Sequence, residues 1–142
     1  MRFKKLTTTA ITPTRGTPGS AGLDLYADRW ASVPHGASRM VGTGIAVEIP
    51  EGYVGLVTVR SSMGREGVSL ANSVGIVDSD YRGELILNLY NHSYVHADGF
   101  GVSAGERIGQ LVVVPAPTFD LTEVDSLSTT ERGEGGFGST GR

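Results

Sequence analysis

The chain has 142 residues, of which 39% are hydrophobic and 19% charged, and its formal net charge is −3. These values are typical of one globular domain with a single core, and they exclude a disordered chain. The sequence has no basic block for a nucleic-acid backbone, no cysteine, and no apolar run long enough for a signal peptide or a membrane span, so we expect a cytoplasmic protein without nucleic-acid or membrane partners.

Short strand-like runs, bounded by Gly, Pro, Asn and Asp, recur along the chain. In the first of them Ile45, Val47 and Ile49 share one face, as the side chains of a half-buried strand do. The last run is more continuously apolar, which indicates a strand covered on both sides or lying in an oligomer interface. One short helix is expected from Ser61 to about Glu66, with Ser61 as its cap. The sequence therefore predicts an all-β sandwich or barrel of jelly-roll type, with strands at residues 44–49, 53–60, 85–90 and 108–114.

The glycine-rich end of the chain differs from the rest, because almost none of its residues suits a core. We expect residues 1–126 to form the β domain and residues 127–142 to form a mobile arm of that same domain. Arg132, Ser139 and Thr140 have side chains of the kind that bind phosphate, and Phe137 is free to stack on a base. A flexible linker without a function is the alternative.

Two further segments carry polar side chains suited to chemistry. Asp78 and Asp80 stand two residues apart, so in an extended chain both carboxylates would face the same way. One would then orient a water molecule, although an ordinary acidic turn is the alternative. Arg60, Ser61 and Ser62, where a strand meets the expected helix, suit an anion site, although serines there are also common helix caps.

Two histidines and one acid are weaker candidates. His92 and His96 have the spacing of a metal pair on a helix, but they lie in an expected loop with no third ligand nearby. A metal site is therefore the less favoured interpretation. Asp24, which belongs to a turn or a strand edge, is uninformative by itself.

In order along the chain, five segments resemble the motifs of the trimeric dUTPase family: AGLDLYA from residue 21, RSSMGREG from 60, NSVGIVDSDYRGE from 72, GERIGQL from 105 and RGEGGFGSTG from 132. The resemblance implies a jelly-roll-like β-clip barrel with one short helix, a mobile C-terminal arm, and a homotrimer whose subunits share their active sites. It also implies Mg²⁺-assisted hydrolysis of dUTP to dUMP and pyrophosphate, which keeps uracil out of DNA and supplies dUMP for thymidylate synthesis.

The resemblance assigns a role to each matching residue. Asp78 matches the carboxylate that activates the water attacking the α-phosphorus, and Asp24 matches the acid that holds a water of the magnesium shell. Tyr81 matches the ring under the deoxyribose that leaves no room for a 2′-hydroxyl. The phosphate contacts are Arg60, Ser61, Ser62 and Gln110. Uracil is read in a hairpin by Asn72 and the backbone around Ile76, Val77 and Ile86. The closing arm contributes Arg132, Phe137, Gly138, Ser139 and Thr140.

The chain also departs from the family pattern. Val59 stands where Pro is common, Ser62 replaces Gly, and Gly109 replaces Ala. The segment 60–67 is one residue shorter than is typical of the family, and the segment 92–104 is a few residues longer. Two alternatives follow: a dCTP deaminase, which shares the fold and an Arg-Ser-Ser segment, or a dUTPase that also acts through a regulatory protein partner bound at residues 92–104.

Overall fold

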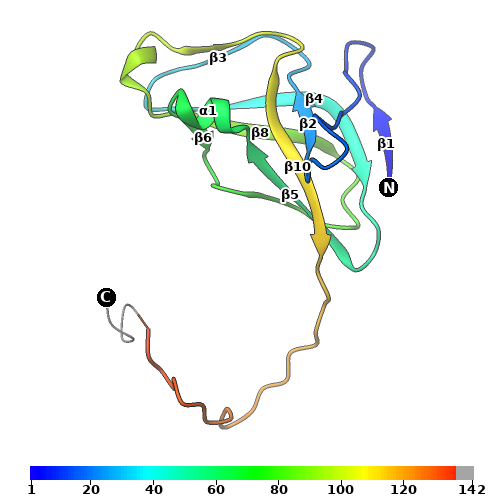
Figure 1. Cartoon of the computed structure of the whole chain (residues 1–142), viewed down its shortest axis with the longest axis vertical. Helices are drawn as coiled ribbons and strands as arrows, with labels where there is room; N and C mark the ends of the chain where they lie inside the picture. Colours follow the sequence, from blue (N-terminus) through cyan, green and yellow to red (C-terminus); the bar gives the residue numbers. More distant parts are fainter. Residues whose placement is uncertain (137–142) are drawn as a thin grey trace.

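The computed structural model describes residues 1–136, and residues 137–142 lie outside the described part. Within the described part the chain forms strands, one short α-helix and one 3-10 turn (Figure 1). The strands are β1 (Arg2–Lys5), β2 (Leu23–Tyr26), β3 (Ala31–Val33), β4 (Ser38–Glu48), β5 (Tyr53–Val59), β6 (Val68–Leu70), β7 (Gly75–Val77), β8 (Glu84–Asn91), β9 (Phe100–Val102) and β10 (Arg107–Pro115). The helix α1 is Ser61–Arg65, and the 3-10 turn η1 is Tyr94–His96.

The strands form two four-stranded sheets and one small pair, all antiparallel. The first sheet has the order β1-β4-β8-β6, the second β2-β10-β5-β7, and β3 pairs with β9. One apolar core takes side chains from both large sheets, with Leu25, Ile108 and Leu111 from one and Ile45 and Leu87 from the other. This arrangement confirms the predicted all-β, jelly-roll-like fold.

The predicted strands are present, and their burial follows the alternation of the sequence. Ile45 and Val47 are buried on β4, although Ala46 between them is buried as well. β4 begins before the predicted run, at Ser38. On β8 the burial alternates along the whole strand, and Leu85 is one of its buried residues. β10 is a central strand whose first half is buried, whereas its second half, from residue 112, is only half-buried in the single chain.

The short helix is confirmed, but its predicted cap is wrong. The N-cap position belongs to Arg60, whose backbone is extended, and no side chain caps the helix. β5 ends at Val59, so Ser61 is already the first helical residue. Its hydroxyl is therefore not used to cap the backbone and lies on the rim of a cavity described below.

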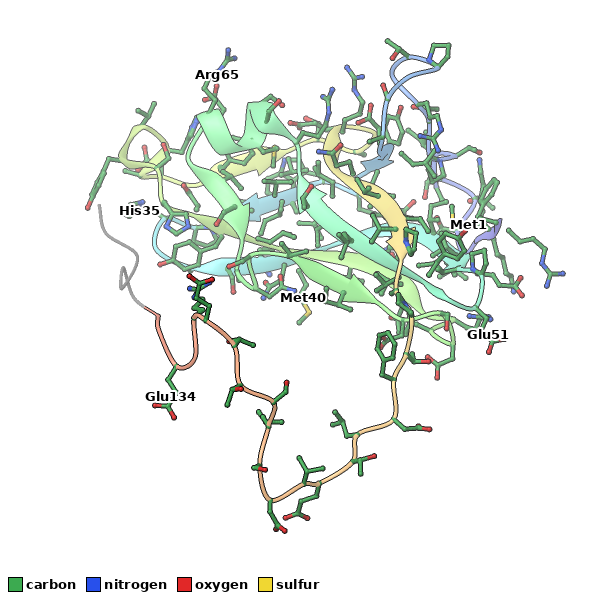
Figure 2. The ribbon with its side chains drawn as sticks, turned by 60° about the horizontal axis from the view of Figure 1, so that its bottom comes forward. Met1, His35, Met40, Glu51, Arg65 and Glu134 are labelled. Carbon is green, nitrogen blue, oxygen red and sulfur yellow. The ribbon has the colours of Figure 1, made fainter. Side chains whose placement is uncertain are left out.

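The chain leaves the packed body after β10. The Ala116 N–H donates to the Gly52 carbonyl, and residues 117–134 are exposed (Figures 1 and 2). Figure 2 shows the side chains of this segment, with Glu134 labelled, projecting into open space. The only helices of residues 1–136 are short, and none is long and apolar enough to cross a membrane.

Gly109 explains one departure from the family pattern. It lies beside the register shift between β10 and β2. A Cβ atom there would approach the Thr58 carbonyl oxygen to 2.7 Å and would overlap the Leu87 side chain from the facing sheet. Leu87 thus occupies the space that an alanine at position 109 would need.

We therefore predict that Gly109→Ala lowers the free energy of unfolding by about 1–3 kcal/mol, because the added methyl overpacks the core. Urea denaturation measures the change, and adding Leu87→Val should restore part of it. Gly101→Ala on β9 is the control, because a Cβ there meets nothing within 4 Å. Full stability of Gly109→Ala would contradict this explanation.

Candidate active site

The first candidate cavity, called here the Asp78 cavity, lies where the two large sheets meet at the C-terminal end of β7. It has a volume of about 230 Å³. Its lining combines apolar side chains with two acidic residues, an amide and a phenol: Val57, Asn72, Gly75, Ile76, Val77, Asp78, Tyr81, Glu84, Leu85 and Ile86. The structure thus brings together the predicted catalytic carboxylate and the predicted nucleoside contacts of residues 72–86, whereas Phe137, which was also expected at the base, lies outside the described residues.

Backbone pairing places Asp78 at this cavity. β7 lies at the edge of its sheet, where Val77 pairs with Gly55, and the chain turns directly afterwards because the Asp78 carbonyl accepts the Tyr81 N–H at 3.2 Å. The extended geometry considered for Asp78 and Asp80 is therefore wrong. Both residues are exposed, but Asp78 lines the cavity, whereas Asp80 lines a different hollow.

The predicted uracil hairpin is also wrong, because its two strands, β7 and β8, do not pair with each other. β7 pairs with β5, whereas β8 pairs with β4 and β6 in the other sheet. Residues 78–83 cross between the sheets. Ile76 and Ile86 therefore line the same cavity from two different sheets and are not paired in one strand ladder. Their side chains are 62% and 48% exposed, which leaves an apolar opening for a flat, partly apolar ligand.

Tyr81 is held in place at the cavity. Its hydroxyl donates to the Glu84 carbonyl oxygen at 3.0 Å. Its ring lies so close to Gly83 that a Cβ atom at that position would overlap the ring. Nearby, the Asn72 side-chain amide donates to the Val74 carbonyl at 3.3 Å, within a tight turn in which Ser73 has a φ of +62°.

The second cavity, called the Asp24 cavity, has a volume of about 200 Å³. Asp24 on β2 lies opposite Gln110 on β10, and Arg60 reaches the same place from the end of β5. The residues that line it are small or polar: Gly16, Ser20, Gly22, Asp24, Arg60, Ser61 and Gln110. A Cβ atom at Gly22 would meet the Gln110 side chain, so this glycine leaves room for the amide.

Asp24 pairs with two arginines. Its Oδ1 lies 3.2 Å from the Arg60 Nε, and its Oδ2 lies 3.3 Å from the Arg107 Nη1. The Asp24 side chain is only 13% exposed, whereas the two guanidinium groups are 30% and 47% exposed. Two cations and one anion leave this cavity locally positive in a protein of net charge −3, which favours an anionic ligand.

Arg107 was not among the site residues expected from the sequence. Its partner depends on the register of β10 against β2, where Arg107 lies opposite Tyr26, and that register cannot be inferred from spacing. An arginine at the start of an otherwise apolar strand was the available signal, because a lone charge beside a buried strand needs a partner.

Several predicted residues do not join either cavity. Ser62 is exposed on α1, outside the lining of the Asp24 cavity. Arg132 lies on the extended C-terminal segment, where its Nε donates to the Gly135 carbonyl at 2.8 Å. The predicted contacts of Phe137, Gly138, Ser139 and Thr140 lie outside the described residues. The two cavities share no lining residue, so the single chain does not bring Asp78 and Arg60 into one site.

The two histidines join residues 92–96 to the segment from α1 to β6. The His92 Nε2 lies 2.8 Å from the Ser69 hydroxyl, and the His96 Nε2 lies 3.1 Å from Glu66. The predicted loop at residues 92–104 contains η1 and β9. The buried Asn91 fixes it by donating to the Val33 and His96 carbonyls and accepting the Ser93 N–H.

The chain is similar to known proteins over almost its whole length. A family model described as dUTPase matches residues 8–141. A deoxyuridine 5′-triphosphate nucleotidohydrolase of Syntrophotalea carbinolica is 44% identical over 144 residues, covering 99% of this chain and 96% of the relative.

Two phage proteins represent the similar solved structures. The dUTPase of Staphylococcus bacteriophage 80alpha, solved with dUpNHpp, has a TM-score of 0.89 and 30% identity, covering 99% of this chain and 98% of its own. It is described among phage dUTPases that control transfer of virulence genes by a proto-oncogenic G protein-like mechanism. A mutant dUTPase from phage phi11 of S. aureus, described for its structural Mg(II) ion, has a TM-score of 0.79 and 25% identity, covering 88% of this chain and 96% of its own.

Proposed function

Because this chain belongs to the dUTPase family and is a dUTP nucleotidohydrolase, we propose that Asp78 activates the water that attacks the α-phosphorus of dUTP. The products are dUMP and pyrophosphate, so the reaction keeps uracil out of DNA and supplies dUMP for thymidylate synthesis. The observation that carries the proposal is the Asp78 cavity, where this carboxylate and Tyr81 border a partly apolar pocket. The deaminase alternative is not favoured, because the family match is to dUTPase.

In the proposed reaction, Asp78 accepts a proton from water while the water oxygen bonds to the α-phosphorus. The bond from that phosphorus to the α–β bridging oxygen breaks, and pyrophosphate leaves with the electron pair. An aspartate is a weak base at neutral pH, so the electrophile must be strongly activated by cations around the triphosphate.

The nucleoside fits the rest of the Asp78 cavity. Ile76 and Ile86 supply apolar contact for the base, and Asn72 with the neighbouring backbone supplies hydrogen bonds to its edge. Tyr81, which Gly83 and the Glu84 carbonyl hold in place, packs under the sugar and excludes a 2′-hydroxyl. A rigid wall is needed for this, because a movable one rejects an extra hydroxyl weakly.

The Asp24 cavity is suited to the phosphates. Arg60 and Gln110 offer donors, and Ser61 adds a hydroxyl near the α–β bridging oxygen, whereas the exposed Ser62 would have to turn inward to contribute. In residues 1–136 no three His, Cys, Asp or Glu side chains gather. The chain therefore offers Mg²⁺ one carboxylate, Asp24, to hold a water of its shell, while phosphate oxygens supply direct ligands. When bound, the ion neutralises charge on the triphosphate.

The separation of the two cavities supports a homotrimer with shared active sites. One subunit would supply the Asp78 cavity, another the Asp24 cavity, and the arm with Arg132, Phe137, Gly138, Ser139 and Thr140 would close over the base and γ-phosphate. Apolar side chains beyond β10 agree with this, since Phe119, Leu121 and Leu127 are 82%, 99% and 87% exposed in the single chain. A second copy would remove such surface from water.

A regulatory protein partner has separate support. Tyr94 and Val95 on η1 are each 87% exposed, on a segment that Asn91 fixes from below. The similar phage 80alpha protein is described in the control of gene transfer. Serine at both positions should abolish partner capture without changing turnover, because neither residue lines either cavity; capture unaffected by the change would refute this role.

Asp78→Asn should lower kcat for dUTP by roughly 10²–10⁴-fold while dUTP binding persists, because the amide keeps the shape but cannot take the proton. Pyrophosphate release from dUTP, UTP, dTTP and dCTP, with and without magnesium, is the measurement. Asp80→Asn is the matched control in the same turn and should retain turnover. Near-normal turnover by Asp78→Asn, or ammonia released from dCTP, would contradict the proposal.

Subunit mixing tests the shared site. Asp78→Asn and Arg60→Met should each be nearly inactive, yet random exchange of the two should restore about one quarter of wild-type turnover per site, because one chain then supplies Asp78 and its neighbour Arg60. Asp78→Asn mixed with Tyr81→Ala is the control, since both residues line the same cavity and should not complement. If the first mixture also stays inactive, the site is not shared in this way.

A further inference from the structure

Glu84 stands between two cavities at the start of β8. It lines the Asp78 cavity and also a hollow of about 310 Å³ behind it, which is bordered by Asp28, Trp30 and Gly42. The catalytic scheme gives this carboxylate no role. Its Oε1 accepts the Gly44 N–H at 2.7 Å, so the side chain points away from the nucleoside opening and into β4.

The N–H group that donates to Glu84 lies in a bulge of β4. The pairing of β4 with β8 shifts register between Gly42 and Ala46, and Gly44 has a φ of +65°. A Cβ atom at Gly42 would approach the Glu84 Oε1 to 2.5 Å. Two glycines therefore make the space and the backbone conformation that let this carboxylate reach a main-chain N–H.

The bulge is held from three sides. The Leu6 N–H donates to the Gly44 carbonyl at 2.7 Å, and the Asp28 N–H donates to the Gly42 carbonyl at 2.9 Å. Thr43 is fully buried, and its hydroxyl donates to the Leu85 carbonyl at 2.7 Å. The bulge is thus a fixed point of the core rather than a flexible edge.

Asp28 is itself tied into this support. Burial raises the pKa of its carboxyl group, but hydrogen bonds from Thr9 and Thr7 and the nearby Arg29 outweigh that effect and leave the pKa below its ordinary value. Both threonine hydroxyls donate to the Asp28 Oδ1 at 2.7 Å. The N-terminal segment and the β2–β3 turn are therefore fastened to each other behind the bulge.

The backbone of Glu84 holds the Tyr81 side chain. The tyrosine hydroxyl donates to the Glu84 carbonyl oxygen, and the ring packs on Gly83, the residue before Glu84. Both anchors of the ring therefore depend on where the backbone of residues 83 and 84 lies. That backbone is fixed in turn by the Glu84 carboxylate and by the pairing of Glu84 with Ala46.

We propose that Glu84 is a positioning residue whose carboxylate fastens the start of β8 to the β4 bulge and so fixes Tyr81 for discrimination between deoxyribose and ribose. This inference rests on the proposed function of Tyr81. The role requires a hydrogen-bond acceptor but no charge, so glutamine should replace glutamate.

The experiment compares kcat/KM for dUTP and for UTP in the wild type, Glu84→Ala and Glu84→Gln. Glu84→Ala should lower the dUTP-to-UTP ratio by roughly tenfold, because a loosened ring admits the 2′-hydroxyl. Glu84→Gln should keep the wild-type ratio and shows whether position 84 tolerates substitution in a folded enzyme. An unchanged ratio in Glu84→Ala, or an equal loss in both variants, would overturn the proposal.

Thr43→Val is the matched control on the same bulge. It removes the hydroxyl bond to Leu85 but leaves the Glu84 carboxylate on Gly44. Its thermal stability should fall while its ratio stays near that of the wild type. An equal loss of discrimination in Thr43→Val would show that any loosening of the bulge suffices, and the specific role of Glu84 would then be wrong.

A double-mutant cycle with Tyr81→Phe tests the route from Glu84 to the ring. If Glu84 acts through the anchored tyrosine, the losses in Glu84→Ala and Tyr81→Phe should not add in the double variant, whereas additive losses would exclude this route. Failure of the proposed function looks different, because the wild type itself would then fail to prefer dUTP over UTP.

Discussion

Asp78 and Asp24 belong to opposite edges of one four-stranded sheet, and this separation governs how the protein can act. β2, which carries Asp24, and β7, which ends just before Asp78, are three strand spacings apart, or about 14 Å across the sheet. Hydrolysis needs the activated water within bonding reach of a phosphorus whose oxygens are held by the cationic cavity. In the single chain the strand ladder fixes Asp24 on β2 and the end of β7 just before Asp78, which keeps the two acids apart. The proposed mechanism therefore requires a second copy, which would set its own cationic cavity against the first copy's Asp78.

Within each cavity the backbone, more than the polar side chains, determines the geometry. The Asp78 cavity exists because the chain leaves one sheet at Val77 and enters the other at Glu84, so its walls come from both layers. The middle of this crossing is held by Arg82, whose Nη1 donates to the Ser79 carbonyl at 2.6 Å and to the Tyr81 carbonyl at 2.8 Å. The Asp78–Tyr81 turn supports one end, and the β4 bulge supports the other. The two glycines of the bulge, which cost conformational entropy, are thus tied to the precision of a site on another strand.

The sequence predicts the long strands better than the short ones. β8 alternates over enough residues to reveal which face is buried, whereas β3 and β9 have three residues each and show no period. Alternation also cannot identify a strand's partner, and the hairpin implied by the family resemblance around Ile76 and Ile86 is not a strand pair, because β7 pairs with β5 and β8 pairs with β4 and β6. The assignment of Asp78 and Arg60 came from motif order. The structure places Asp78 in a cavity with Tyr81 and places Arg60 in another with Ser61 and Gln110, but it leaves Ser62 outside. Arg107 was not predicted, because only the register of β10 brings it to Asp24.

The position of Asp24 between two arginines answers an electrostatic problem of an acidic protein that takes a polyanion. Without the aspartate, the guanidinium groups of Arg60 and Arg107 would lose their shared partner, repel each other and turn toward solvent, since both are partly exposed. The carboxylate reduces the net attraction for a phosphate, but it holds both groups where a phosphate would arrive. Ordering them before binding lowers the entropy that the substrate must supply. The proposed role of Asp24 toward magnesium places a second requirement on the same carboxylate, because holding a water of the magnesium shell would use the oxygens that contact the arginines in the single chain. Under that proposal, the oxygens of the triphosphate would replace Asp24 as partners of the guanidinium groups and would leave the carboxylate for the water.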